Sequence, residues 1–136
     1  MPIVDDPTIP NDSILLRVLH GSWVTNKGGR SRPASFSLID SNYEASCFIS
    51  NQASLSELQR LFPGLTVAGI PAAVIRACGF AIERRPGECG PNYAGNPNDH
   101  VVVGPPEPRP RNEVQRMAKA IVEDPGVFLL RMLPNS

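Results

Sequence analysis

The chain has 136 residues, with thirteen acidic and thirteen basic side chains, so its formal net charge is zero. This length supports one hydrophobic core, and the balanced charge excludes long-range attraction to nucleic acid or to an anionic membrane. Nucleic acid would therefore have to bind through a local basic patch. Fifteen prolines and eleven glycines predict ordered loops between short elements.

The sequence predicts an irregular arm over 1–12 and a single domain over 13–136. The elements expected in the first half of the chain are strands, turns and one helix. Three prolines in the arm interrupt any ladder or helix. Alternating apolar residues then predict strands, and Ser54-Leu55-Ser56-Glu57 matches a capping box. The predicted elements are a strand over 14–20, a turn over 26–29, a hairpin of strands 33–40 and 43–50 with its turn at 40–42, and a helix from 54 to 62.

The second half predicts more strands than helices. A proline opens one helix and an apolar stripe marks another, while valine and leucine runs indicate buried strands. The predicted elements are strands over 65–70, 80–83, 101–103 and 127–133, helices over 71–79 and 112–123, and a long loop over 86–99. Because strands and helices do not alternate strictly, we expect a single α+β domain with a mixed or antiparallel sheet of about 5–7 short strands and 2–3 helices.

The two histidines, His20 and His100, are the first candidates for chemistry. Each follows or precedes an apolar strand beside a loop rich in glycine, asparagine or aspartate. If those strands are neighbours, both imidazoles face one cleft, where histidine transfers protons or binds anions. Arg17 lies on the same predicted strand as His20. The alternative is that each imidazole hydrogen-bonds a loop and only finishes its strand.

Two loops are candidates for binding a partner or an anion. Lys27, Arg30 and Arg32 surround a glycine pair whose backbone amides can hold a phosphate, although the ending of a Walker loop is missing. The same residues also fit an ordinary solvated hairpin tip. In the long loop, Tyr93 and Asn96 offer stacking and polar contacts that suit recognition of a protein partner.

The three cysteines favour a reducing compartment because they are odd in number and widely spaced. We expect Cys47 and Cys78 to be small core residues and Cys89 to be exposed. Since the chain has no C-x-x-C and no H-x-x-x-H, we expect no metal site and no cofactor. The first residues match no signal or transit peptide, and no apolar run is long enough for a membrane span. A cytoplasmic location is therefore the expectation.

The order of several polar residues is similar to the nucleotide site of ADP-ribosyltransferases. Those enzymes place an arginine or histidine on an early strand, serines on a second strand and a glutamate on a later one. The matching positions here are Arg17 or His20, then Ser35-Phe36-Ser37, then Glu44 or Glu83. The resemblance implies a nucleotide-processing activity.

A second resemblance concerns a group of small uncharacterised bacterial proteins with motifs Arg-Ile-His-Pro, Ser-x-Ala-Phe and Asn-Pro-x-His. Segments in the same order here are Leu16-Arg17-Val18-Leu19-His20, Arg32-Pro33-Ala34-Ser35-Phe36, and Asn96-Pro97 with His100. The resemblance covers about residues 13 to 104. Gly21 replaces the proline, and Asn98-Asp99 lengthens the last motif by one residue. This resemblance implies bacterial origin and marks His20, Phe36 and His100 as positions of interest.

Two hypotheses of function follow. The first is a non-enzymatic accessory subunit of a bacterial multiprotein system, which recognises a protein partner through its Pro/Gly-rich loops. The alternative is a small enzyme that acts on a nucleotide or nucleic acid with His20, His100 and Arg17. The sequence favours the first because it shows no recognisable set of catalytic residues.

Overall fold

The described part of this computed structural model, residues 3–27, 29–39 and 43–134, contains eight strands and three α-helices. Six strands form one sheet in which all neighbours are antiparallel, in the order β6-β7-β4-β1-β5-β8. Their bounds are β1 Ile14–Leu19, β4 Ala45–Ile49, β5 Thr66–Pro71, β6 Ala81–Arg84, β7 His100–Gly104 and β8 Phe128–Arg131. The predicted α+β class is confirmed.

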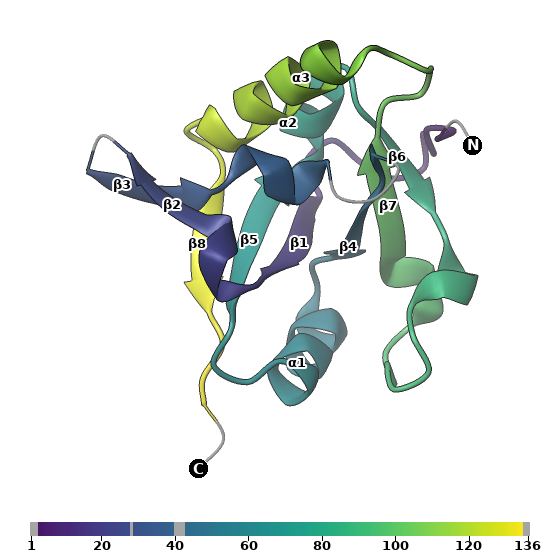
Figure 1. Cartoon of the computed structure of the whole chain (residues 1–136). Helices are drawn as coiled ribbons and strands as arrows, with labels where there is room; N and C mark the ends of the chain where they lie inside the picture. The colour runs from purple at the N-terminus through teal and green to yellow at the C-terminus, as the bar shows by residue number, and fades with distance from the viewer. Residues whose placement is uncertain (1–2, 28, 40–42, 135–136) are drawn as a thin grey trace.

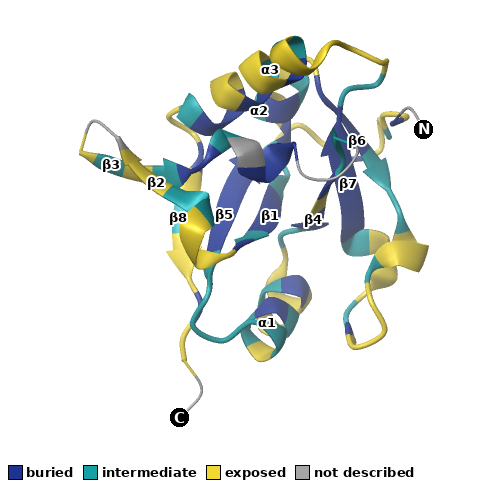
Figure 2. Ribbon diagram, viewed as in Figure 1, coloured by how far each residue is buried: buried dark blue, intermediate teal, exposed yellow. Residues whose placement is uncertain are grey.

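Two of the helices lie together and the third lies apart from them (Figure 1), and the two groups pack on different apolar clusters. Helices α2 (Ala72–Ala77) and α3 (Arg111–Glu123) pack on the larger cluster, which includes Leu15 and Leu19 of β1. Helix α1 (Gln52–Leu61) packs on the smaller cluster with Leu16 of β1. Alternation along β1 therefore sends successive side chains to two cores, and Figure 2 shows this central strand largely buried.

The N-cap of helix α1 lies three residues before the predicted one. Its N-cap is Asn51, whose side chain accepts from the Ser54 amide, while the Ser54 hydroxyl accepts from the Asn51 amide. The sequence-based assignment of Ser54 as the cap was wrong. Asparagine is as good a cap as serine, and Ser54 also donates to the Ile49 carbonyl at 2.7 Å, which ties the helix to β4.

The predicted strand over 33–40 is a 3₁₀ helix at Ser35–Leu38, so the predicted hairpin of 33–40 with 43–50 does not exist. The Ser37 hydroxyl donates to the Ala34 carbonyl at 2.7 Å, a local bond that competes with extended pairing. The observed hairpin is β2 (Val24–Lys27) with β3 (Arg30–Pro33), and Gly29, which precedes β3, has a φ of +75°. The predicted turn at 40–42 lies outside the described residues.

The long loop over 86–99 is ordered by its contacts with α1. It contains two 3₁₀ turns, Pro86–Glu88 and Pro97–Asp99. Its Ala94 amide donates to the Glu57 carboxylate at 2.7 Å, and Arg60 of α1 donates to a loop carbonyl at 2.6 Å. The loop and α1 therefore form one structural unit.

The described part of the arm, residues 3–12, contains no helix or strand but is anchored to the domain. Ile9 is buried in the larger cluster, and the Asp6 amide donates to the Ile82 carbonyl at 2.8 Å. Among the described residues, none of the helices has the length and apolar character that a membrane crossing requires.

Strand β1 pairs unequally with its two neighbours. It pairs with β5 along its whole length, but with β4 only at Leu15–Ile49 and Leu16–Phe48. In a regular ladder the next pairs would join Arg17 to Cys47 and Val18 to Ser46. The two strands separate there, and the opening forms the candidate site.

Replacing Asn51 with alanine tests the observed cap. We expect Asn51→Ala to lower the free energy of unfolding by about 1 kcal/mol, because the Ser54 amide loses its acceptor. Urea denaturation measures this loss. Ser56→Ala, at an exposed position of the same helix, is the matched control and should change stability much less. Equal losses in the two variants would contradict the assignment of Asn51 as the cap.

Candidate functional site

A cavity of about 230 Å³ lies where β1 and β4 separate. We call it the ladder cleft. It is lined by Arg17, His20, Trp23, Ser46, Phe48 and Phe62, together with Val18. The cleft combines aromatic walls with a guanidinium, an imidazole and a hydroxyl, and a small ligand site typically needs such a mixture.

Arg17 holds the open strands together. Its guanidinium donates to the Ser46 carbonyl of β4 at 2.8 Å and to the Ser37 carbonyl at 2.9 and 3.2 Å. It also lies 5.3 Å from the ring centre of Trp23, in range for a cation–π contact. Arg17 is only 7% exposed, so a largely buried charged group forms part of the wall of the cleft.

Ser46 is exposed to the cleft, and behind it lies the buried His100 of β7. The Ser46 Oγ is 2.5 Å from His100 Nε2, and His100 Nδ1 is 2.8 Å from the Arg85 carbonyl oxygen. The two side chains meet because Ser46 opposes Val102, two residues along β7 from His100. Phe48 packs against the imidazole, with ring centres 5.1 Å apart.

The contacts of His100 determine its tautomer. A carbonyl oxygen only accepts, so Nδ1 carries the proton and donates to Arg85. In the neutral ring Nε2 is then an acceptor, and the Ser46 hydroxyl donates to it. Burial lowers the pKa of His100 below its ordinary value of 6.5, and the backbone bond to Arg85 opposes that shift in part. The imidazole is therefore neutral at pH 7.

Arg85 is itself held by carboxylates. Its guanidinium binds Glu44 through two hydrogen bonds of 2.7 and 3.0 Å, and its Nε donates to Glu83 at 2.6 Å. The bond from Arg85, and then the backbone bond from Val4, lower the pKa of Glu83. Glu44 and Glu83 were the glutamates of the ADP-ribosyltransferase comparison. Both pair with Arg85 rather than lining the ladder cleft.

The predicted histidine and arginine candidates are partly brought together. Arg17 and His20 line the same cleft, and His100 reaches it through Ser46. His20 is exposed at the end of β1, where its ring meets Trp23 edge-on at 4.8 Å. The sequence-based hypothesis required the strands of the two histidines to be neighbours, whereas β4 lies between them and supplies the connecting serine.

The basic turn contributes two arginines to structural contacts. Arg30 donates to the Pro125 carbonyl at 3.2 Å and also to the Val127 carbonyl, which ties the hairpin to the start of β8. Arg32 lies 3.9 Å from Glu123 of α3. The side chain of Lys27 lies outside the described residues. The side chain of Phe36, singled out by its motif, lies outside them too.

The two candidates in the long loop also have structural contacts. Tyr93 is 8% exposed and stacks on Phe48 with ring centres 4.7 Å apart, so it supports the ring that packs on His100. Its hydroxyl is buried and finds no hydrogen-bond partner among the described residues. The Asn96 side chain accepts from the Asn98 amide at 3.0 Å and caps a 3₁₀ turn.

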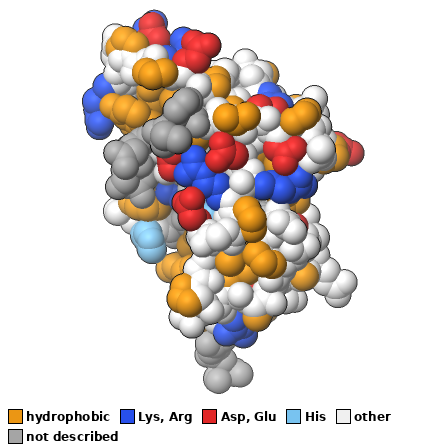
Figure 3. All heavy atoms as spheres, turned by 90° about the vertical axis from the view of Figure 1, so that its right-hand side faces the viewer, with side chains coloured by type: hydrophobic (Ala, Val, Ile, Leu, Met, Phe, Trp, Pro, Cys, Tyr) orange, Lys and Arg blue, Asp and Glu red, His pale blue; other side chains and the backbone are white. Residues whose placement is uncertain are grey.

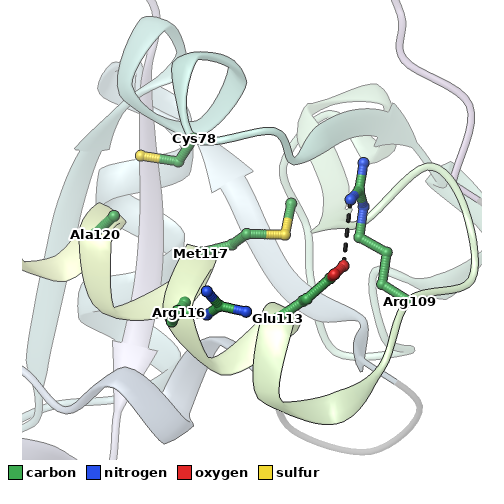
Figure 4. A pocket seen from close by; sticks show the side chains of 6 residues that line it. All are labelled: Cys78, Arg109, Glu113, Arg116, Met117 and Ala120. Carbon is green, nitrogen blue, oxygen red and sulfur yellow. Dashed lines mark hydrogen bonds and ion pairs between the residues drawn. The ribbon is translucent and has the colours of Figure 1, made fainter.

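A second cavity, of about 370 Å³, lies between the end of α2 and α3 (Figure 4). Its lining includes Cys78 and the ion pair of Arg109 with Glu113, whose nearest atoms are 3.4 Å apart. Burial, and then the charge of Asp124, raise the pKa of Cys78, so its thiol is a poor nucleophile. Cys47 is buried as expected, and Cys78 is half-buried against the larger cluster. Cys89 is half-buried, so the expectation that it is exposed was wrong.

Acidic and basic side chains are intermixed on the surface. Figure 3 shows blue and red side chains side by side over one face of the molecule, rather than a broad area of one sign. Ion pairs of this kind include Arg84 with Asp6 at 2.9 Å and Arg76 with Asp5 at 3.1 Å. Among the described residues, no three His, Cys, Asp or Glu side chains are grouped to hold a metal ion.

Comparison of the chain with protein-family models, with curated proteins and with solved structures gave no match. The resemblance in three short motifs therefore stays a prediction. The site has to be interpreted from its own geometry.

Sequence reasoning missed Ser46. It stands in an alternating strand, where a serine every second residue is the ordinary pattern of a face that meets solvent. Its pairing with His100 depends on the register of β4 with β7, which are more than fifty residues apart in the chain. The one signal in the sequence was a serine next to Cys47 and Phe48, two residues of apolar type.

The buried neutral state of His100 predicts a pH effect on stability. Below pH 6.5 the unfolded chain takes up this proton before the folded chain does, so His100 makes stability fall as the pH falls. We expect His100→Gln to cost about 1–3 kcal/mol at pH 8, through loss of its buried hydrogen bonds. That cost should shrink towards pH 5. Urea denaturation across the pH range measures it, with His20→Gln as the control for an exposed histidine.

Proposed function

We propose that the chain binds, in its ladder cleft, a small ligand that joins a planar ring to an anionic group. The observation that carries the proposal is the position of Arg17, a guanidinium held in a cleft with aromatic walls. Nucleotides belong to this class of ligand, as do aromatic acids.

The walls supply surfaces for a planar ring. Trp23, Phe48 and Phe62 line the cleft, and aromatic pairs in offset or edge-to-face geometry are worth about 0.5–1.5 kcal/mol beyond their buried area. His20 stands exposed at the rim beside Trp23, where it can contact a ligand without supporting the core.

The polar groups of the cleft can orient a ligand. Arg17 is fixed by hydrogen bonds to two carbonyls, so its charge does not have to be ordered when a ligand arrives. A guanidinium is also the cation that pairs most directly with carboxylate and phosphate groups. At about 230 Å³ the cavity is smaller than most sites for drug-sized molecules, which favours a compact ligand.

Trp23 is the single tryptophan of the chain and lines the cleft, so its emission reports on binding. We expect saturable quenching by at least one of AMP, NAD⁺, phenyl phosphate and benzoate, with a rise in melting temperature at saturation. His20→Ala should weaken that binding by about 2- to 10-fold, because one aromatic contact is lost.

The control for this titration is Gln115→Ala, at an exposed position on α3 away from the cleft. It should leave both the affinity and the melting temperature unchanged. Absence of quenching and of any thermal shift across the whole panel would contradict the proposal.

A second candidate function, binding of a protein partner, is supported by the last strand. Phe128, Leu130 and Leu133 are 40%, 37% and 71% exposed, and the first two lie on the same side of β8. Large apolar side chains grouped at a sheet edge are typical of interaction surfaces. This surface differs from the Pro/Gly-rich loops that the sequence indicated.

Replacing Leu130 tests the partner hypothesis. If the tagged chain captures a protein from its source cells, Leu130→Ser should reduce that capture at least about tenfold, since it removes an apolar contact at the centre of the surface. Val4→Ser, at another exposed apolar residue, is the matched control. Equal capture by all three proteins would place the interface elsewhere.

A further inference from the structure

We infer that Ser46 is a catalytic nucleophile activated by His100, and that the ladder cleft hydrolyses small carboxylic esters. The geometry that points to this is one continuous chain of hydrogen bonds, from the Ser46 hydroxyl through both nitrogens of His100 to the Arg85 carbonyl. Nucleophile, base and orienting group stand in the order that serine-dependent acyl transfer requires. The inference uses the cleft of the proposed binding function, and so rests on a ligand reaching that cleft.

The exposure of the two side chains suits their roles. Ser46 is exposed and lines the cleft, whereas His100 is only 2% exposed. The nucleophile can therefore meet a substrate, while the base is shielded from water. Cys47, the next residue on the strand, points to the opposite side and is fully buried; burial raises the pKa of its thiol to about 11.

His100 is held in the tautomer that a general base needs. The Arg85 carbonyl accepts the Nδ1 proton, which leaves the Nε2 lone pair directed at the Ser46 hydroxyl. Arg85 is thus a positioning residue. Its guanidinium is hydrogen-bonded to Glu44 and Glu83. These bonds restrict the movement of Arg85, and so help to hold the backbone carbonyl that orients the imidazole.

The charge that develops on a substrate also has a partner nearby. Arg17 donates to the backbone carbonyl of Ser46, so its positive charge lies beside the residue that carries the attacking oxygen. The Ser46 amide faces the same opening, because the N–H and C=O of one strand residue point to the same side. Donors placed in this way favour the negative oxygen of a tetrahedral intermediate.

The reaction transfers the acyl group twice, first to the Ser46 oxygen and then to water. The Ser46 oxygen bonds to the ester carbonyl carbon while its proton passes to His100 Nε2, and the carbonyl electron pair moves to oxygen. That pair returns, the bond to the leaving oxygen breaks, and the alcohol departs with the proton from His100. Water then attacks the acyl-serine with His100 again as base, which releases the acid and restores the Ser46 hydroxyl.

A fluorophosphonate probe tests the nucleophile, since it forms a bond to an activated serine with loss of fluoride. We expect the folded protein to be labelled at Ser46, as located by peptide mass spectrometry. Ser46→Ala should abolish labelling and also hydrolysis of p-nitrophenyl acetate. His100→Gln should slow labelling at least about 100-fold, the usual contribution of a general base. Ser56→Ala, which removes another exposed serine, should react at the wild-type rate.

The pH dependence gives a test that needs no substitution of the buried residue. Labelling should be constant above pH 6.5 and fall only at lower pH, as His100 becomes protonated. Arg85 and Glu88 are the charged groups that act on this imidazole, in opposite directions. A labelling rate that rises through pH 9, as for an unassisted hydroxyl, would overturn the inference.

The outcomes separate this inference from the proposed binding function. Absence of label on the folded wild-type protein, label on another residue, or equal labelling of His100→Gln would each overturn the role of Ser46. Trp23 quenching by a ligand would still be observed in those cases if the cleft binds aromatic anions. Conversely, labelling at Ser46 without any ligand response would support the nucleophile and contradict the proposed class of ligand.

Discussion

The guanidinium of Arg17 stands where a β-ladder would otherwise continue. Past Leu16 and Phe48 the two strands separate, and the Ser46 carbonyl loses the backbone donor that a regular partner at Val18 would provide. Arg17 supplies that donor from a side chain and bonds the 3₁₀ helix at Ser35–Leu38 as well. A buried carbonyl without such a bond costs free energy, so the opening is stable only with this side chain in place.

The cleft, the aromatic wall and the exposed serine all depend on that opening. Had β1 and β4 remained paired, the backbone of Val18 would lie against Ser46, and the space between Trp23 and Phe48 would be closed. The site is therefore a local interruption of a regular sheet. The rest of the sheet stays continuous, with β1 paired to β5 at every residue, and so holds the two sides of the opening in fixed positions.

Local patterns predicted most of the elements, since helix α3 and strands β1, β5 and β7 carry strong apolar periodicity. They failed at Ser35–Leu38, where alternation indicated a strand but a serine-to-backbone bond favours a tight turn. Of the site, His20, His100 and Arg17 were predictable as unusual residues. Their connection through Ser46 was not, because it depends on the register of strands far apart in the chain.

The strand order has a consequence for how the domain assembles. Among the described strands of the main sheet, only β6 and β7 are paired neighbours that also follow one another as strands in the chain. Every other ladder joins two strands with at least one further strand between them in the sequence. Such contacts require long loops to close before they contribute any stability, which slows folding. The central strand β1 is made first during synthesis, yet it must wait for β4 and β5 before either of its edges is covered. Until then β1 has unpaired apolar edges that can pair with another chain. The domain is therefore most prone to aggregate before its fold is complete.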